Sequence, residues 1–179
     1  MSTPQASIIA SCDAVVAYLN TLQTPPAPPV TVPPTPPAVN PFAPFTFTAY
    51  RDYAPVFELA DPSLSNLHVV VCPRDKDTGK MEGRNSWLQN DGIDILILIK
   101  PANFDPSGLV AARLAILDPL MLLVEQIANA VAFVDFAGAG WIRTQNNPIY
   151  APDGPMGLRQ SKLFTSVLHL TLRGRGYKT

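Results

Sequence analysis

The stretch Asp91–Lys100, DGIDILILIK, decides the fold of this chain. Side chains in a β-strand alternate between two faces, and one face here is all isoleucine: Ile93, Ile95, Ile97 and Ile99. The other face is apolar only in its middle, at Leu96 and Leu98. Because β-branched residues at every second position fit a pleated and packed surface, we predict an interior strand of a sheet. Helices are expected to cover its isoleucine face.

The overall composition limits the classes of protein that fit this sequence. The 179 residues suffice for one domain with a substantial core. The formal net charge of -1 provides no strong field that would attract the molecule to nucleic acid or to an anionic membrane. No run approaches the roughly 20 apolar residues that a transmembrane helix needs, and the N-terminus lacks the pattern of a signal peptide. We therefore expect a soluble protein that is intracellular when it is made.

The first 44 residues divide into a helix (1–23) and a proline-rich segment (24–44). Apolar residues recur three and four positions apart from Ile8 to Leu22, which is typical of an amphipathic helix. Ten prolines lie between residues 24 and 44. Since proline lacks the backbone donor, this composition predicts polyproline II or irregular structure.

Three interpretations of the proline-rich segment are open. It is a stiff linker that holds the first helix against its own domain, an arm that crosses to a neighbouring subunit, or a ligand for an SH3-type domain. For the crossing arm, the candidate contact residues are Pro28, Pro29, Pro33 and Pro34.

Strands are expected on both sides of a long polar segment. Alternating residues in 45–57 predict one or two strands near a sheet edge, interrupted at Pro55, and residues 67–72 predict another. The polar segment 73–90 then predicts a long hairpin whose far strand begins around Trp87. This hairpin is either a solvated loop with offsetting charges or a contact surface, for which the candidates are Arg74, Asp75, Lys76, Asp77 and Lys80.

The second half of the chain predicts helices followed by two strands. Asp105-Pro106 and Asp118-Pro119 each resemble a helix cap followed by a first-turn proline, which predicts separate helices over 106–116 and 119–134. Strands are expected at 141–143 and at 163–172. A basic tail with Arg173 and Arg175 follows, and it is either solvent-exposed or a contact with nucleic acid or protein.

The order of these elements predicts an α+β fold with a largely antiparallel sheet and helices packed on one face. The N-terminal helix (1–23) and the proline-rich arm (24–44) precede the main domain (45–179). A small open sheet has unpaired edges that must be covered or used. Identical subunits offer the same edge repeatedly, so this organisation favours assembly into a ring.

Catalytic and cofactor signals are scarce. The sequence contains no nucleotide-binding motif and no spacing typical of a metal site, so we expect no cofactor and no metal. The two histidines, His68 and His169, and the two cysteines, Cys12 and Cys72, form no sequence motif. The enzyme alternative is a small hydrolase that uses Cys72 or His169 together with a carboxylate in a closed cleft.

Four stretches carry a resemblance to a known family: LHVVVCPRDKDTGK, NDGIDILILIK, LMLLVEQIANAVAF and SKLFTSVLHLTLRGR. Their order resembles the tail-completion, or tail-terminator, proteins of long-tailed bacteriophages. In that family a strand with a polar hairpin returns as an apolar interior strand, an apolar helix follows, and the chain closes on a strand ending in arginine. The resemblance covers residues 45–175, and the segment 24–44 is longer than the family pattern.

The resemblance implies a structural protein of the virion tail or neck, made in the host cytoplasm, and not an enzyme. It implies a homo-hexameric ring that ends polymerisation of the tail tube and joins the tail to the head. The implied partners are the tail tube protein and a head-tail connector or stopper protein, with DNA only as cargo in the channel and no membrane. A head-completion stopper or a minor tail protein is the structural alternative.

Overall fold

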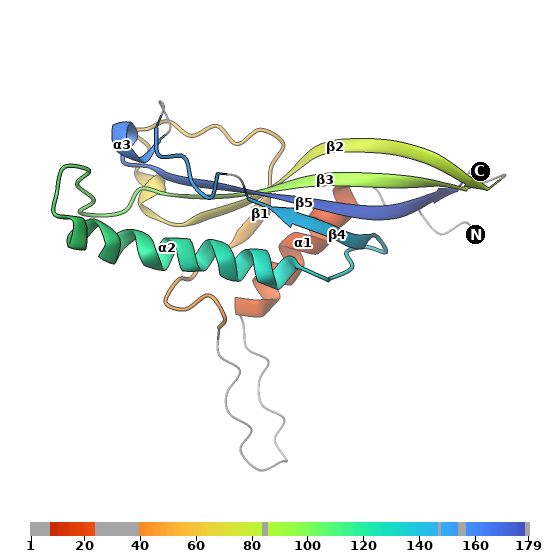
Figure 1. Ribbon diagram of the computed structural model, residues 1–179, viewed down its shortest axis with the longest axis horizontal. Coiled ribbons are helices and arrows are strands. Elements are labelled where there is room, and N and C mark those ends of the chain that lie inside the picture. Colours follow the sequence, from red (N-terminus) through yellow and green to blue (C-terminus); the bar gives the residue numbers. More distant parts are fainter. Residues whose placement is uncertain (1–7, 24–39, 84–85, 147, 154–156, 178–179) are drawn as a thin grey trace, which may run out of the picture.

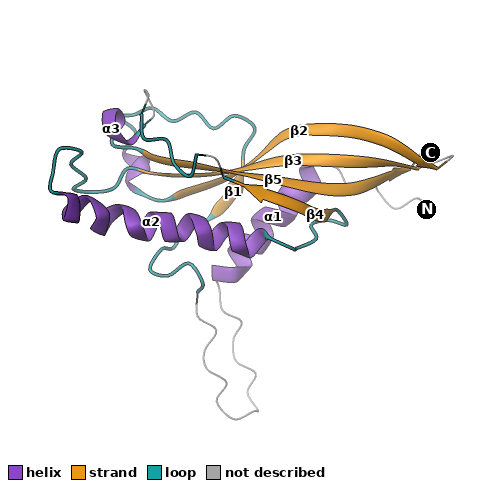
Figure 2. Ribbon diagram, viewed as in Figure 1, coloured by secondary structure: helices purple, strands orange, loops and turns teal. Residues whose placement is uncertain are grey.

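The computed structural model describes residues 8–23, 40–83, 86–146, 148–153 and 157–177. Figures 1 and 2 show a twisted sheet with two long helices beneath it. The elements in chain order are α1 (Ile8–Gln23), β1 (Ala49–Arg51), the 3-10 helix η1 (Pro62–Ser65), β2 (His68–Gly83), β3 (Ser86–Ile99), α2 (Val110–Val131), β4 (Gly140–Gln145), α3 (Leu158–Ser161) and β5 (Phe164–Tyr177).

The five strands form one sheet in the order β1-β2-β3-β5-β4. The short β1 pairs with β2 in parallel, whereas β2–β3, β3–β5 and β4–β5 are antiparallel. The central β3 is paired along its whole length, from Ser86 to Ile99, with β5. The fold is therefore α+β with a largely antiparallel sheet, and the prediction of an interior strand at Asp91–Lys100 is confirmed.

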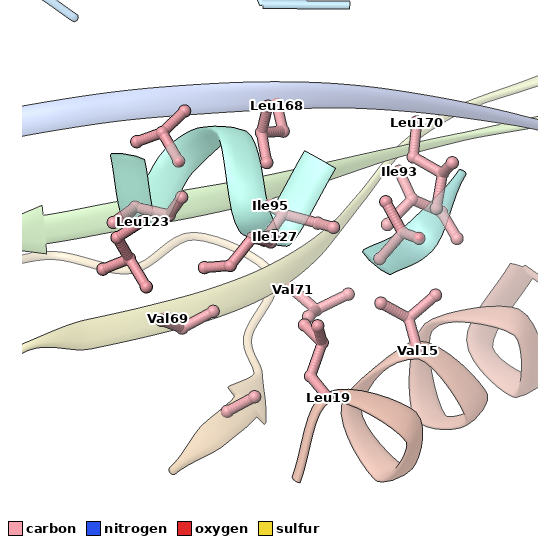
Figure 3. Close-up of a cluster of buried hydrophobic side chains, with 14 of the residues drawn as sticks. Val15, Leu19, Val69, Val71, Ile93, Ile95, Leu123, Ile127, Leu168 and Leu170 are labelled. Atoms are coloured by element: carbon pink, nitrogen blue, oxygen red, sulfur yellow. The ribbon is translucent and has the colours of Figure 1, made fainter. Parts of the chain in front are cut away.

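The main core lies between the sheet and the two long helices (Figure 3). Ile93, Ile95 and Ile97 of β3 are fully buried and belong to the same cluster as Val15 and Leu19 of α1. The matching face of α2 contributes Leu120, Leu123, Val124, Ile127 and Val131. The helices thus cover the isoleucine face, as the alternation predicts, and α1 packs against the sheet of its own chain.

A smaller cluster covers part of the opposite face of the sheet. Val70, Cys72, Leu98 and Leu163 are buried there beneath Leu64 of η1. The Asp61 carboxylate caps η1 by accepting a hydrogen bond from Ser63 N at 2.7 Å. That bond lowers the pKa of Asp61, because it favours the charged carboxylate.

The predicted break between two helices at residues 116–119 is wrong. A single helix, α2, runs through Pro119, although this residue lacks the N–H that would donate to the preceding turn. The apolar residues on both sides of Pro119 pack against the core, including Ile116, Leu117 and Leu120. This packing holds the two halves in one helix.

The predicted helix start at Asp105 is also wrong. The Asp105 carboxylate accepts hydrogen bonds from Ser107 N at 2.9 Å and from Ser107 Oγ at 2.7 Å, and this closes a turn ahead of the helix. Both bonds lower the pKa of Asp105. The helix begins only at Val110.

The segment 45–57 contains less strand than predicted. Only Ala49–Arg51 pairs with the sheet, although the position at an edge is confirmed. The Phe47 N–H donates to Gln23 Oε1 of α1 at 2.8 Å, and the Phe47 ring packs on Phe42. The alternation of Phe45 and Phe47 thus serves packing against the main core rather than pairing with a strand.

The outer surface of α2 is strongly apolar. By length and composition alone, α2 could cross a membrane, and one of its faces is packed on the sheet. Large apolar side chains remain exposed on the opposite side, at Val110, Leu114 and Leu122. Val110 and Leu114 lie at the N-terminal end of the helix.

Loss of a central isoleucine should destabilise the chain strongly. We expect Ile95→Ala to lower the free energy of unfolding by about 2–5 kcal/mol, because it leaves a cavity in the middle of the main core. Urea denaturation followed by circular dichroism measures this change. Leu122→Ala is the control, since Leu122 is 52% exposed on the far side of α2 and should change the free energy by no more than about 0.5 kcal/mol. Equal effects would contradict the assignment of the core.

Candidate assembly surfaces

A three-stranded arm projects beyond the helices (Figure 1). It consists of residues 73–83 of β2, 86–92 of β3 and 171–177 of β5. The predicted long hairpin is confirmed as the first two of these strands. The predicted basic tail is wrong up to Tyr177, because β5 continues in register with β3 as far as the pair Ser86–Tyr177. The candidate residues of the hairpin and of the tail therefore belong to one structural unit.

The candidate contact residues differ in their exposure and in whether the structure describes their side chains. Arg74, Asp75, Lys76 and Asp77 are exposed on β2. Arg173 lies on β5, where its Nε donates to Asn90 Oδ1 at 3.3 Å. Lys80 and Arg175 lie within β2 and β5, but their side chains are outside the described part of the structure. The proline candidates Pro28, Pro29, Pro33 and Pro34 are outside the described residues.

A network of ionisable side chains joins the three strands at the base of the arm. Asp94 of β3 accepts from Arg74 Nη1 at 3.2 Å and lies 2.7 Å from Nδ1 of His169. Arg74 Nε also lies 3.3 Å from Asp75 Oδ2. The Asp75 carboxylate and the Arg74 guanidinium lie over Gly92, where a larger residue would displace them. Because these groups are partly exposed, the network positions side chains more than it stabilises the fold.

One outer edge of the sheet is covered by the chain's own helix. The Asn20 side chain of α1 donates to Ala49 O at 3.0 Å and accepts from Ala49 N at 2.8 Å. The amide thus satisfies the outward backbone groups of Ala49 as a neighbouring strand would. Arg51 Nε pairs with Asp13 of α1 at 2.9 Å beside it. The β1 edge is therefore closed to another chain.

Two other edges remain open. Within the described residues, no backbone group pairs with the outer side of β4. The outer side of β2 is also unpaired beyond Val71 within the described residues. β1 pairs only with Val69–Val71, and beyond β1 one further backbone hydrogen bond runs from Asp52 N to Val71 O. An unpaired strand edge is a template for another strand.

The two open edges lie at the same level of the sheet. Following the pairing across the strands, Cys72 is in line with Asp94, His169 and Gln145. In the next row on the same face, Asp75 is in line with Gly92, Thr171 and Arg143. Residues 72–77 of β2 therefore lie directly across the sheet from β4. Each edge also has a β-bulge at this level, at Arg74 and at Ile142.

The side chains on these two edges are complementary. Asp75 and Arg143 carry opposite charges in the same row and on the same sheet face. On the other face, Lys76 lies in the row of Trp141. The Trp141 ring contacts Phe133, whose side chain is 83% exposed, at a centroid distance of 4.2 Å. Trp141 itself is half-buried against the core, so Phe133 is the exposed member of this pair. An aromatic pair at an edge is a typical anchor for a partner, and it attracts a cation such as that of Lys76.

Asn20 and the edge residues Trp141 and Arg143 were missed as functional candidates at the sequence level. No local signal could identify Asn20, because its partner Ala49 is 29 residues away. Trp141 and Arg143 lie in an ordinary short strand, and only the order of strands in the sheet shows that this strand is an edge.

The geometry does not favour the hydrolase alternative. His169 and Asp94 form a close pair, but Cys72 lies two strands away from His169 in the same row. Two strand spacings amount to about 10 Å, which is far beyond hydrogen-bonding distance. Burial also raises the pKa of the Cys72 thiol to about 11, so the nucleophilic thiolate is suppressed near neutral pH. The described residues contain no group of three or more potential metal ligands.

Both cysteines should be unreactive in the native protein. Burial raises the pKa of Cys12 to about 12 and that of Cys72 to about 11, and both are free and shielded. We expect negligible reaction with Ellman's reagent at pH 8 over minutes, and complete reaction in guanidinium chloride. Rapid labelling of native Cys72 would contradict this expectation and revive the enzyme alternative.

No protein-family model matches this chain, and a search of curated proteins finds no relative.

Proposed function

We propose that this protein is a structural component of a phage virion, a tail terminator that assembles into a homo-hexameric ring. The ring would sit at the head-proximal end of the tail, end polymerisation of the tail tube and join the tail to the head connector. The sequence pattern supports the family, and the α+β sheet with its long polar hairpin is consistent with it.

The observation that carries this proposal is the position of two open edges on opposite sides of one sheet at one level. β2 and β5 run in the same direction, because both are antiparallel to β3, and β4 runs against them. A neighbour in the same orientation thus presents its β2 antiparallel to β4. Such a head-to-tail contact uses two different surfaces, so it closes into a ring when the rotation between copies permits.

The arm supplies the contact between rings. The lateral contacts run across the strands, whereas the arm extends along them and beyond the helices (Figure 1). Its tip therefore stays free to meet the tube or the connector when the bases of neighbouring arms are joined. Capping is then geometric, because the arm end and the opposite end of the subunit present different surfaces. DNA would pass through the channel as cargo, in keeping with the net charge of -1.

A pair of engineered cysteines tests the edge contact. In the double variant Asp75→Cys and Arg143→Cys, mild oxidation should give a ladder of disulfide-linked species that ends at the hexamer on a non-reducing gel. The native cysteines give no background because they are buried. Mass in solution by light scattering, together with electron microscopy of the rings, measures the assembly without cross-linking.

The two single-cysteine variants are the matched controls for this experiment. Each should remain unlinked, because a head-to-tail contact never brings two identical residues together. Efficient dimers from either single variant would indicate a symmetric two-fold contact and overturn the head-to-tail ring. A strict monomer at high protein concentration would overturn the proposed function itself.

Deletion of residues 27–37 should weaken ring formation. The proposal assigns the proline-rich segment to a contact between neighbours, so the deletion removes that contact and leaves the sheet and its edges in place. We expect light scattering to show a lower average mass at the same protein concentration, with an unchanged circular dichroism spectrum. An unchanged mass would remove this segment from the assembly contacts.

A further inference from the structure

A cavity of about 250 Å³ lies at the N-terminal end of α2, at the opposite end of this helix from α1. It opens between the first turns of α2 and the segment around α3. Most of its wall is apolar: Phe104, Val110, Leu114, Leu117, Tyr150 and Leu158. Val110 and Leu114 are 60% and 48% exposed, so the exposed apolar end of α2 continues into the cavity.

The charged side chains in the wall, Arg113 and Arg159, are hydrogen-bond donors. Arg113 Nη1 donates to Pro106 O at 3.3 Å, but Arg113 Nε is shut off from solvent and has no acceptor in the described structure. Arg159 Nη1 pairs with Asp153 at the exposed rim, at 3.2 Å. A buried charged donor without a partner is unfavourable by at least about 1–3 kcal/mol. The guanidinium groups of Arg113 and Arg159 line this apolar wall and can only donate, so the cavity suits an apolar occupant that brings carbonyl oxygens.

The segment 24–39 of this chain has that chemistry. Eight of its 16 residues are proline, and it contains no charged residue. Proline has no N–H group, so this segment carries twice as many backbone carbonyls as backbone donors. Proline-rich chains dock in apolar grooves that contain aromatic rings, and their carbonyls accept bonds from donors in the groove. Phe104 and Tyr150 supply the rings, and Arg113 supplies the donor.

We propose that the cavity binds the proline-rich segment 24–39 of a neighbouring copy of the chain. This inference rests on the proposed ring and names the receiving surface for the arm. It also assigns a partner to the exposed apolar end of α2, which the edge contact leaves unused.

The distance that the segment can span favours a neighbouring copy over the same chain. Both ends of the segment are held near the C-terminal end of α2, where Tyr18 of α1 packs on Phe136 and Gln23 accepts from Phe47 N. A loop of 16 residues that goes out and returns reaches about 25 Å at 3.1 Å per residue. Within α2, the donor Arg113 precedes Val131 by 18 residues, or about 27 Å along the helix axis, which is beyond this reach.

Cross-linking of the full-length protein tests the inference. Chains that carry Thr31→Cys are co-expressed with differently tagged chains that carry Leu114→Cys, and the assembly is treated with a short bismaleimide. We expect a cross-linked pair of chains, with the link between residues 31 and 114 identified by mass spectrometry. Adding Arg113→Met to the second chain should lower the yield about tenfold, because the guanidinium donor in the cavity wall is lost.

Leu122→Cys replaces Leu114→Cys in the matched control. Leu122 lies on the same helix and is 52% exposed, compared with 48% for Leu114, but it does not line the cavity. Equal yields at the two positions would overturn the inference. A link formed only within one chain, in the double variant Thr31→Cys and Leu114→Cys, would also overturn it.

The edge cross-link between positions 75 and 143 separates this inference from the proposed function. Rings that still close through the edges but give no link at residue 114 refute only the docking of the segment. If neither cross-link forms and the protein is a monomer, the proposed function fails as well.

Discussion

The rest of the structure depends on the register of β3 within the sheet. β3 is paired on both sides and buries Ile93, Ile95 and Ile97 beneath the helices. A slip of one residue would turn this isoleucine face away from the helices and expose it, so the register is strongly determined. With the same register, β3 continues to pair with β2 and β5 in the arm, and this pairing aligns β2 with β5 at the base of the arm. The position of every charged residue at that base follows from how the core packs.

One edge of the sheet is covered by the chain's own helix, and two other edges are uncovered in the described structure. At β1, Asn20 and Asp13 of α1 satisfy Ala49 and Arg51, so the chain covers this edge with its own helix. At β4 and along the base of β2, no described segment takes this role. An uncovered edge invites uncontrolled pairing. In the proposed ring, opposite charges and an aromatic pair at these two edges restrict the neighbour to one that supplies the complement.

Sequence reasoning located most strands and the apolar faces of both long helices, because each depends on periodicity within a few residues. It failed where distant contacts overrode a local signal. Pro119 predicts a helix boundary, but core packing on both sides keeps α2 continuous. Arg173 and Arg175 resemble a solvated tail, but β3 provides a partner strand for them. Phe45 and Phe47 alternate with polar residues as in a strand, but the Phe47 N–H donates to Gln23 and the Phe47 ring packs on Phe42.

The sequence by itself determined the α+β class, the interior strand Asp91–Lys100 and the composition of the proline-rich segment. These follow from alternation, from helical spacing and from the missing N–H of proline, all of which are local properties. Only the tertiary structure decided that Asp75 and Arg143 share a row, that Asn20 closes one edge, and that Arg113 faces a cavity without an acceptor. Strand order and helix docking bring these residues together, and no local pattern encodes which distant segments become neighbours.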